Sequence, residues 1–232
     1  MPIQAVEPRR LYRQVADQLR QLINAGEFPV GTRLPTEREL AEQLGISRPT
    51  VREALIALEV EGHIRIRVGS GIFVNAASEA PPPTPDFNEG PLELLRAREF
   101  IEGAIASEAA VHAGDSDIEK MDDALRRMEA VGDAAQEAVA LDREFHITVA
   151  GILGNAVLVR SIGELFDQRM NPYFERLSRY FENKASWRAA VQEHRAVRDA
   201  IASHNPEGAK TAMQKHLQMS QTRFSQNFGE DS

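Results

Sequence analysis

The 232-residue sequence contains no cysteine and no long apolar run. The absence of cysteine excludes disulfide bonds, thiolate metal sites and cysteine nucleophiles, and it suits a reducing compartment. No apolar stretch approaches the roughly 20 residues that a membrane-spanning helix needs, and the N-terminal MPIQAVEPRRLYRQ lacks the apolar core of a signal peptide. We therefore expect a cytoplasmic protein that has no membrane partner.

Positive charge is scarce in the chain as a whole, since the formal net charge is −8. Residues 1–75 nevertheless hold ten basic residues, all arginine, against nine acidic ones, which leaves 17 basic and 26 acidic residues for the rest. Local charge placement matters more for DNA binding than the whole-chain sum. The distribution therefore leaves the N-terminal part open to a nucleic-acid partner.

A proline-rich stretch divides the sequence. NAASEAPPPTPDFNEG, residues 75–90, contains three consecutive prolines and is typical of an extended spacer. The length allows two modest domains. We assign residues 1–75 to a first domain, 76–90 to a linker and 91–232 to a second domain.

The first domain has the pattern of a winged helix-turn-helix. LYRQVADQLRQLINAGEF carries a helical apolar stripe, TERELAEQLG begins with a T-x-x-E capping box and ends at a glycine, and SRPTVREALIALEVEG begins with a serine N-cap. HIRIRVGSGIFV alternates apolar and basic residues around GSG, which indicates a β-hairpin. Three helices followed by a basic hairpin predict a DNA-reading module.

We predict that short hydroxyls and arginines at the start of the third helix are exposed and contact DNA. Ser47, Arg48, Thr50 and Arg52 suit phosphates and guanine edges, Arg38 can reach the backbone, and Gly69 at the wing tip lets the main chain approach. The alternative is a winged helix used for protein contacts, whose arginines form a solvated face.

The segment LPTERELAEQLGISRPTVREALIALEVEGHIRIRVGSGIFV, residues 34–74, resembles the GntR family of bacterial regulators. The resemblance implies that Arg38, Arg48, Thr50, Arg52 and Gly69 contact double-stranded DNA. It also implies that the chain binds a short palindromic operator as a homodimer.

The second domain reads as entirely helical. Helices are predicted at 91–113, 116–131, 133–152, 155–181, 186–204 and 206–227. Amphipathic helices joined by short loops predict an antiparallel bundle, so the fold class is mainly α.

Three histidines fall in mid-helix within this bundle. Asp142 and His146 in DREFH lie one turn apart on an inward face, and His194 and His216 lie on two other helices. A buried, hydrogen-bonded pair would explain DREFH alone, whereas a metal ion would satisfy all of these groups together. Three imidazoles and a carboxylate suit Zn²⁺, Ni²⁺, Mn²⁺ or Fe²⁺, and we expect one divalent transition metal per chain, with Zn²⁺ favoured.

Residues 92–220 resemble the FCD ligand-binding domain of the FadR subfamily within GntR, through LLRAREFIEGAIASEAA, DREFHITVAGILGN, EHRAVRDAI and NPEGAKTAMQKHL. In the metal-binding branch of that family the ligands fall on Asp142, His146, His194 and His216. The branch that binds long-chain acyl-CoA lacks this histidine set, which disfavours that effector.

GPLELLRAREFIEGAIASEAA and QRMNPYFERLSRY are most similar to hexuronate regulators of the UxuR/ExuR type. The resemblance implies a sugar-acid effector. Arg98 and Arg169 are candidates to hold a carboxylate, and Glu102 could orient Arg98. Candidates to bind hydroxyls or close the pocket are Asn155, Asn171, Tyr173 and Trp187. The alternative for Arg98 and Glu102 is an ordinary surface ion pair.

Together these features predict a metal-dependent transcription regulator, and we expect a repressor, whose operator affinity changes when a small carboxylate effector binds. Related domains bind lactate, citrate and other small acids, so these remain alternatives. A metalloenzyme acting on an organic acid is a second alternative. A constitutive DNA-binding protein with structural histidines is a third.

Overall fold

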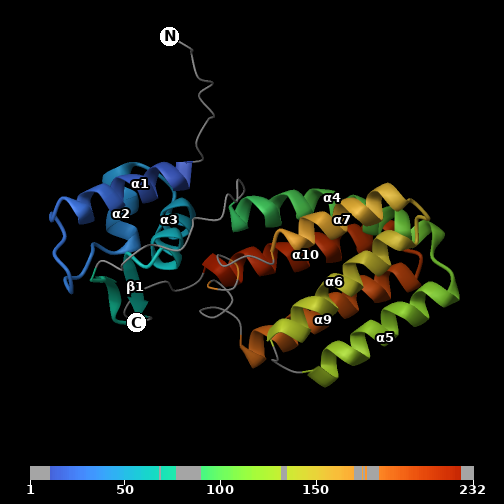
Figure 1. Cartoon of the computed structure of the whole chain (residues 1–232). Helices are drawn as coiled ribbons and strands as arrows, with labels where there is room; N and C mark the ends of the chain where they lie inside the picture. Colours follow the sequence, from blue (N-terminus) through green and yellow to red (C-terminus); the bar gives the residue numbers. More distant parts are fainter. Residues whose placement is uncertain are drawn as a thin grey trace, which may run out of the picture. The chain divides into compact units, whose positions relative to one another are not determined.

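The structure is a computed structural model, and it describes residues 11–67, 69–76, 90–131, 135–169, 174, 176 and 183–225 (Figure 1). The chain divides into two compact units, Met1–Pro91 with Asn227–Ser232, and Leu92–Gln226. Most of the predicted linker lies outside the described residues, so its conformation stays a prediction. None of the helices in the described part combines the length and the apolar character that a bilayer span requires.

The first unit begins with three helices, α1 (Leu11–Asn24), α2 (Glu37–Leu44) and α3 (Arg48–Val60). The capping box at the start of α2 is present: the Thr36 hydroxyl accepts from the Glu39 amide at 3.2 Å, and the Thr36 amide donates to the Glu39 carboxylate at 2.7 Å. Gly45 ends α2 with a φ of 64°, a left-handed conformation that favours glycine. These signals fix the turn between α2 and α3.

The wing follows as two antiparallel strands, β1 (Ile64–Arg67) and β2 (Gly71–Val74). Ile64 and Ile66 are buried, whereas Arg65 and Arg67 between them are exposed, as the period-two pattern predicts. The segment before α2 also joins the wing, because Leu34 donates its amide to the Ile72 carbonyl at 2.8 Å. The sequence pattern did not predict that the segment before α2 pairs with β2.

Helix α3 is the centre of the first unit. It contacts α1, α2 and β1, and most of its length is buried. The buried apolar side chains on these helices are Tyr12, Val15, Ala16, Leu19, Leu40, Ala41, Val51, Ala54, Leu55, Ile56, Ala57 and Leu58. Burial of one such Val, Leu or Ile is worth about 1.5–3 kcal/mol. The N-terminal turn of α3 lies beyond this core and carries the exposed Ser47.

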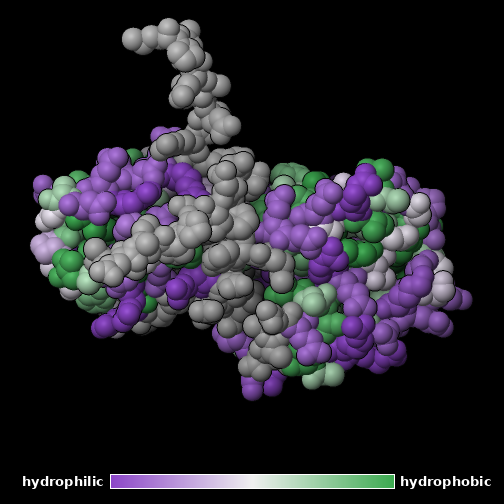
Figure 2. All heavy atoms as spheres, in the orientation of Figure 1, coloured by the Kyte–Doolittle hydropathy of each residue, from purple (hydrophilic) through white to green (hydrophobic). Residues whose placement is uncertain are grey.

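The second unit is a helical bundle. Its helices are α4 (Pro91–His112), α5 (Asp115–Val131), α6 (Ala135–Gly151), α7 (Ala156–Asp167), α9 (Lys184–Ala202) and α10 (Pro206–Ser225) (Figure 1). Contacts join α9 to α10, α5 to α6, α6 to α7, and α5 to α9. In Figure 2 the surface over α5 is mostly hydrophilic, which fits its amphipathic sequence.

The predicted single helix over 155–181 is wrong. Helix α7 ends at Asp167, and Gln168 and Arg169 form a turn in which the Arg169 amide bonds the Phe166 carbonyl at 2.8 Å. Pro172 lies shortly after this turn and disfavours helical backbone in the residue before it. The break matters for the site, because it lets Arg169 reach back to α6.

Candidate metal centre and DNA-binding surface

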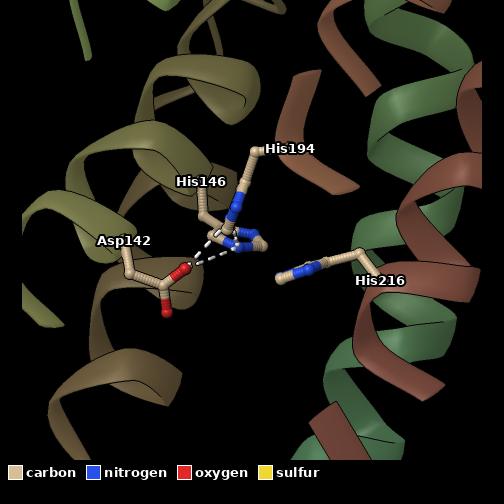
Figure 3. A group of neighbouring side chains, drawn as sticks. All are labelled: Asp142, His146, His194 and His216. Carbon is tan, nitrogen blue, oxygen red and sulfur yellow. Dashed lines mark hydrogen bonds and ion pairs between the residues drawn. The ribbon is translucent and has the colours of Figure 1, made fainter. Parts of the chain in front are cut away.

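Four side chains converge inside the bundle. Asp142 and His146 project from α6, His194 from α9 and His216 from α10, and all four are buried (Figure 3). Each offers one ligand atom, and these atoms lie within 4.8 Å of one another. The one-turn spacing of DREFH therefore places the carboxylate and the imidazole on the same inward face, as predicted.

Each histidine of the cluster bonds a protein oxygen through Nδ1. His146 Nδ1 meets Glu102, His194 Nδ1 meets the Ala190 carbonyl at 2.7 Å, and His216 Nδ1 meets Glu193 at 2.9 Å. These oxygens accept hydrogen bonds, so a neutral imidazole here carries its proton on Nδ1. Its Nε2 lone pair is then free to bind a cation, which is the arrangement found at histidine metal sites.

The remaining ligand atoms face one another. His194 Nε2 lies 2.9 Å from Asp142 Oδ1 and 3.2 Å from His146 Nε2, while His146 Nε2 lies 3.6 Å from the same Oδ1. With Nδ1 protonated in the neutral imidazoles, all three atoms are acceptors, and a cation bound among them would satisfy all three. The donor set of nitrogen and carboxylate oxygen fits a divalent transition metal.

The electrostatics favour the metal-binding forms of Asp142 and His216, the ionised carboxylate and the neutral imidazole. Burial and the neighbouring His194 lower the pKa of His216 to about 3, so its imidazole is neutral near pH 7. Burial alone would raise the pKa of Asp142, but the two histidines beside its carboxylate and the charge of Arg169 hold it well below its usual range. Burial alone would lower the pKa of His146, but the Glu102 and Asp142 carboxylates raise it.

Two arginines border the cluster. Arg169 Nη1 donates to Asp142 Oδ2 at 2.6 Å, and Arg98 Nε donates to Glu102 Oε1 at 2.5 Å. The Arg98 guanidinium stacks on Phe166 at 3.8 Å from the ring centroid. Arg98 and Glu102 are 0% and 2% exposed, so the surface-pair alternative is wrong. Arg98 Nη1 and Nη2 and Arg169 Nε are buried without a hydrogen-bond partner in the described structure.

Two of the other predicted effector residues, Asn155 and Trp187, do not join this group. Asn155 is an exposed N-cap of α7, where its side chain accepts from the Val157 amide at 3.0 Å. Trp187 Nε1 donates to the Met128 carbonyl at 3.0 Å, which ties α9 to the end of α5. Both polar groups are therefore engaged within the protein. Asn171 and Tyr173 lie outside the described residues.

The residues predicted to contact DNA lie on α2, at the start of α3 and between the two strands of the wing. Arg38, Ser47 and Gly69 are exposed, and Arg48 keeps 41% of its side chain exposed. The Ser47 hydroxyl caps α3 and lies 2.8 Å from the Thr50 hydroxyl. Gly69 has a φ of 72°, and no other part of the described structure lies within 4 Å of the point that a Cβ would occupy. This group can present donors and main chain to a phosphate backbone.

The expectation that Arg52 is exposed is wrong. Arg52 is 1% exposed, and its Nε and Nη2 donate to the two carboxylate oxygens of Glu37 at 2.8 and 2.7 Å. The reason is that α3 is buried on almost every face, so a residue one turn after Arg48 already lies against α2. Glu37, on the first turn of α2, neutralises it there.

Several polar partners escaped prediction from the sequence. Glu193 holds His216, and Arg223 in turn donates to Glu193 at 2.8 and 3.1 Å. Glu37 holds Arg48 as well as Arg52, with Arg48 Nε at 2.9 Å. A usable signal existed for Arg223, which lies two helical turns after His216 on the same face.

A winged helix-turn-helix joined to a helical bundle indicates a class of DNA-binding transcription regulators. Family comparison agrees: residues 11–74 match the model of bacterial regulatory proteins of the gntR family, and residues 93–219 match the FCD domain. The chain therefore belongs to the GntR family and carries an FCD domain. It is a DNA-binding transcriptional regulator, and the predicted architecture is confirmed.

Two curated relatives place the chain more closely. The Exu regulon transcriptional regulator of Escherichia coli K12 is 36% identical over 224 residues, covering 93% of this chain and 85% of the relative. The Uxu operon regulator of Haemophilus influenzae is 35% identical over 217 residues, covering 90% and 80%. The resemblance to hexuronate regulators is thus confirmed, and the metalloenzyme alternative falls because family and relatives are regulators.

A solved structure supports the fold. The E. coli McbR/YncC structure has a TM-score of 0.52 and 21% identity, with 95% of this chain and 99% of that chain covered. At this identity the likeness concerns the fold alone.

Proposed function

We propose that the protein is a metal-dependent repressor whose operator affinity is controlled by a sugar acid, a hexuronate or a product of its breakdown. It acts in the cytoplasm as a homodimer on a palindromic operator. The observation that carries the proposal is the buried cluster of Asp142, His146, His194 and His216, bordered by an arginine that has unpaired donors.

The DNA-binding half of the proposal rests on the surface at the start of α3. Arg38 and Arg48 supply exposed or half-exposed positive charge, Ser47 and Thr50 supply hydroxyls, and Gly69 allows close approach of the wing. The role of Arg52 is narrower, because Glu37 holds its guanidinium inside the fold. In this proposal Arg52 fixes the position of α3 and shares a carboxylate with Arg48.

The metal would be held by Asp142 and the three histidines, with Zn²⁺ first among the candidates and Ni²⁺ or Mn²⁺ compatible. When bound, such an ion supplies Lewis acidity and a coordination position that accepts a carboxylate oxygen. The protein's own contribution is orientation: Glu102, the Ala190 carbonyl and Glu193 keep each Nδ1 protonated and each Nε2 turned toward the centre.

The effector would meet Arg98. Its Nη1 and Nη2 are buried and unpaired within the described structure, and an arginine fork matches a carboxylate in shape and charge. Arg169 borders the same region and already holds Asp142. An effector that contacts the metal ligands on one side and these arginines on the other would favour one arrangement of the helices and so change operator affinity.

The first test measures metal content by mass spectrometry on untagged protein purified without chelator. We expect about one transition metal ion per chain, and its loss in His146→Ala. An operator duplex is then selected from random DNA, and its affinity is measured by fluorescence anisotropy with a panel of hexuronates, lactate and citrate. Release by hexuronates alone supports the proposal.

Two results would overturn parts of it. Protein that binds neither Zn²⁺, Ni²⁺ nor Mn²⁺ after incubation would remove the metal and return the histidines to a structural role. Release by lactate or citrate in place of hexuronates would keep the regulator and change the effector.

A further inference from the structure

Two hydrogen-bonded chains, each made of an Arg, a Glu and a His side chain, lead to the cluster. In the first, Arg98 Nε donates to Glu102 Oε1 and Glu102 Oε2 bonds His146 Nδ1. In the second, Arg223 donates to Glu193, and Glu193 Oε2 bonds His216 Nδ1 at 2.9 Å. Each chain fixes a predicted metal ligand through a carboxylate. They differ in what the arginine has left to offer.

In the second hydrogen-bonded chain, Arg223–Glu193–His216, both terminal nitrogens of the arginine have a partner. Arg223 uses both Nη1 and Nη2 on Glu193, at 2.8 and 3.1 Å, and 15% of its side chain is exposed to solvent. Both terminal nitrogens of this guanidinium are therefore engaged by the Glu193 carboxylate. The chain can orient His216, but it has no buried donor directed at a further partner within the described structure.

The first hydrogen-bonded chain, Arg98–Glu102–His146, begins at an arginine that has unpaired donors within the described structure. Arg98 is completely buried and uses only Nε on Glu102, so Nη1 and Nη2 have no partner among the described residues. Its guanidinium stacks on Phe166, and the ring of Phe166 also lies 5.2 Å from that of His146. Leaving two buried guanidinium donors unsatisfied is costly. Glu102, which bonds the predicted metal ligand His146, therefore also positions two Arg98 donors that are available to an acidic group.

We propose that Glu102 is a positioning residue that couples the two sites: it joins the anion-facing Arg98 to the metal-facing His146, so that a bound carboxylate and a bound metal ion strengthen each other. Glu193 serves the metal side alone. The inference rests on the proposed function, because it assumes both a metal and a carboxylate effector, and it adds the residue that transmits between them. Coupling of this kind is reciprocal, since each ligand changes the affinity for the other by the same factor.

The substitution Glu102→Gln tests whether one carboxylate serves both Arg98 and His146. A carboxylate accepts from Arg98 Nε and His146 Nδ1 at once, but an amide has one acceptor oxygen and one donor nitrogen. With its oxygen toward Arg98, its amide group donates to His146 Nδ1 and moves the imidazole proton to Nε2, which blocks metal binding. With its oxygen toward His146, two donors meet at Arg98 and displace it. The variant therefore makes the two sites compete.

The experiment measures Zn²⁺ affinity of the full-length protein by competition with a chromophoric chelator, with and without D-galacturonate. The affinity of D-galacturonate itself for Zn²⁺ is measured separately, and the free Zn²⁺ concentration is corrected for it. In the wild-type protein we expect D-galacturonate to tighten Zn²⁺ binding about 5-fold or more, within the usual range of coupling between sites. In Glu102→Gln we expect weaker Zn²⁺ binding, by about 10–100-fold, and a coupling factor at or below 1.

Glu193→Gln is the matched control. It removes the equivalent carboxylate from His216, so Zn²⁺ binding weakens to a similar extent, while the coupling factor stays at the wild-type value. Arg98→Lys is the second variant: a lysine can pair with Glu102 but offers no fork, so the coupling factor falls although His146 keeps its partner. Circular dichroism confirms that each variant is folded.

The outcomes are distinct. Equal coupling in the wild-type protein and in Glu102→Gln would overturn the role of Glu102, as would an equal loss of coupling in Glu193→Gln. Absence of Zn²⁺ binding, or absence of any D-galacturonate effect on both Zn²⁺ and operator, would overturn the proposed function and the inference with it.

Discussion

Arg52 and Glu37 form a bidentate ion pair in the interior of the first unit, with distances of 2.8 Å from Nε to Oε2 and 2.7 Å from Nη2 to Oε1. Each residue is at most 2% exposed. The same carboxylate accepts from Arg48, whose side chain is 41% exposed. One buried glutamate thus anchors both a structural arginine and a surface arginine of α3.

Removal of Arg52 should therefore destabilise the first unit. Arg52→Ala leaves Glu37 buried with a half-exposed partner only, and loss of one partner of a buried pair costs about 3–5 kcal/mol. Arg48→Ala should change stability by less than about 1 kcal/mol, because its ion pair is close to solvent, yet weaken operator binding. Urea unfolding and anisotropy with the selected operator measure the two effects.

The double substitution Arg52→Met with Glu37→Leu separates charge from packing. An apolar pair of similar volume is often as stable as a buried ion pair, so stability should recover most of the loss. A double variant as unstable as Arg52→Ala would show that the fold needs the ion pair itself, because methionine keeps the packing of the arginine stem.

Exposure of the wing tip gives a second prediction. Gly69 has a φ of 72° and open space around it, and Gly26 has a φ of 82° and equally open space. Alanine at either position incurs the strain of left-handed backbone, about 1–2 kcal/mol. Only Gly69→Ala should also weaken operator binding, because only the wing tip is proposed to approach DNA. Equal operator affinity in the two variants would exclude the wing from the interface.

Local signals carried most of what the sequence could predict. Thr36, Glu39 and Gly45 define the ends of α2 through contacts within a few residues, and Asp142 with His146 share a face by helical period alone. Such features depend on neighbours in the chain. They could be recognised before any tertiary arrangement was known.

The sequence alone could not predict hydrogen-bond partners that come from distant segments of the chain. Periodicity could not show that Arg52 meets Glu37, or that Glu193 and Arg223 support His216, because these pairs depend on how helices pack. The end of α7 at Asp167 was missed for a different reason: an apolar helical pattern was followed across Pro172, although a proline there argues for a break.

Loss of one histidine should uncouple sensing from DNA binding. His194 is 0% exposed and contacts both Asp142 and His146, so His194→Ala should weaken Zn²⁺ binding by more than the roughly 10–100-fold typical of groups that merely hydrogen-bond the ligands. The proposed operator surface lies in the other unit, so operator affinity without effector should change little. Chelator competition and anisotropy measure the two quantities.

His112→Ala is the control for this variant. His112 is exposed at the end of α4 and pairs only with Glu108 among the described residues, at 3.0 Å. Zn²⁺ affinity and effector response should both match the wild-type protein. A full effector response in His194→Ala would mean that the cluster is not the sensor, and attention would move to Arg98 and Arg169.

Metal removal should lower the thermal stability of the second unit. Four ligands from three helices meet at the cluster, so an ion bound there stabilises the packed bundle over the unfolded chain. Binding to the folded state alone stabilises it by about 4 kcal/mol when free metal is 1,000 times the Kd. Differential scanning calorimetry should show a lower Tm after chelator treatment and recovery with Zn²⁺. Mg²⁺, which prefers oxygen ligands, should not restore it, and His146→Ala should show neither the loss nor the recovery. A chelator-treated wild-type protein whose Tm is unchanged would mean that the bundle holds its four buried ligands together without an ion.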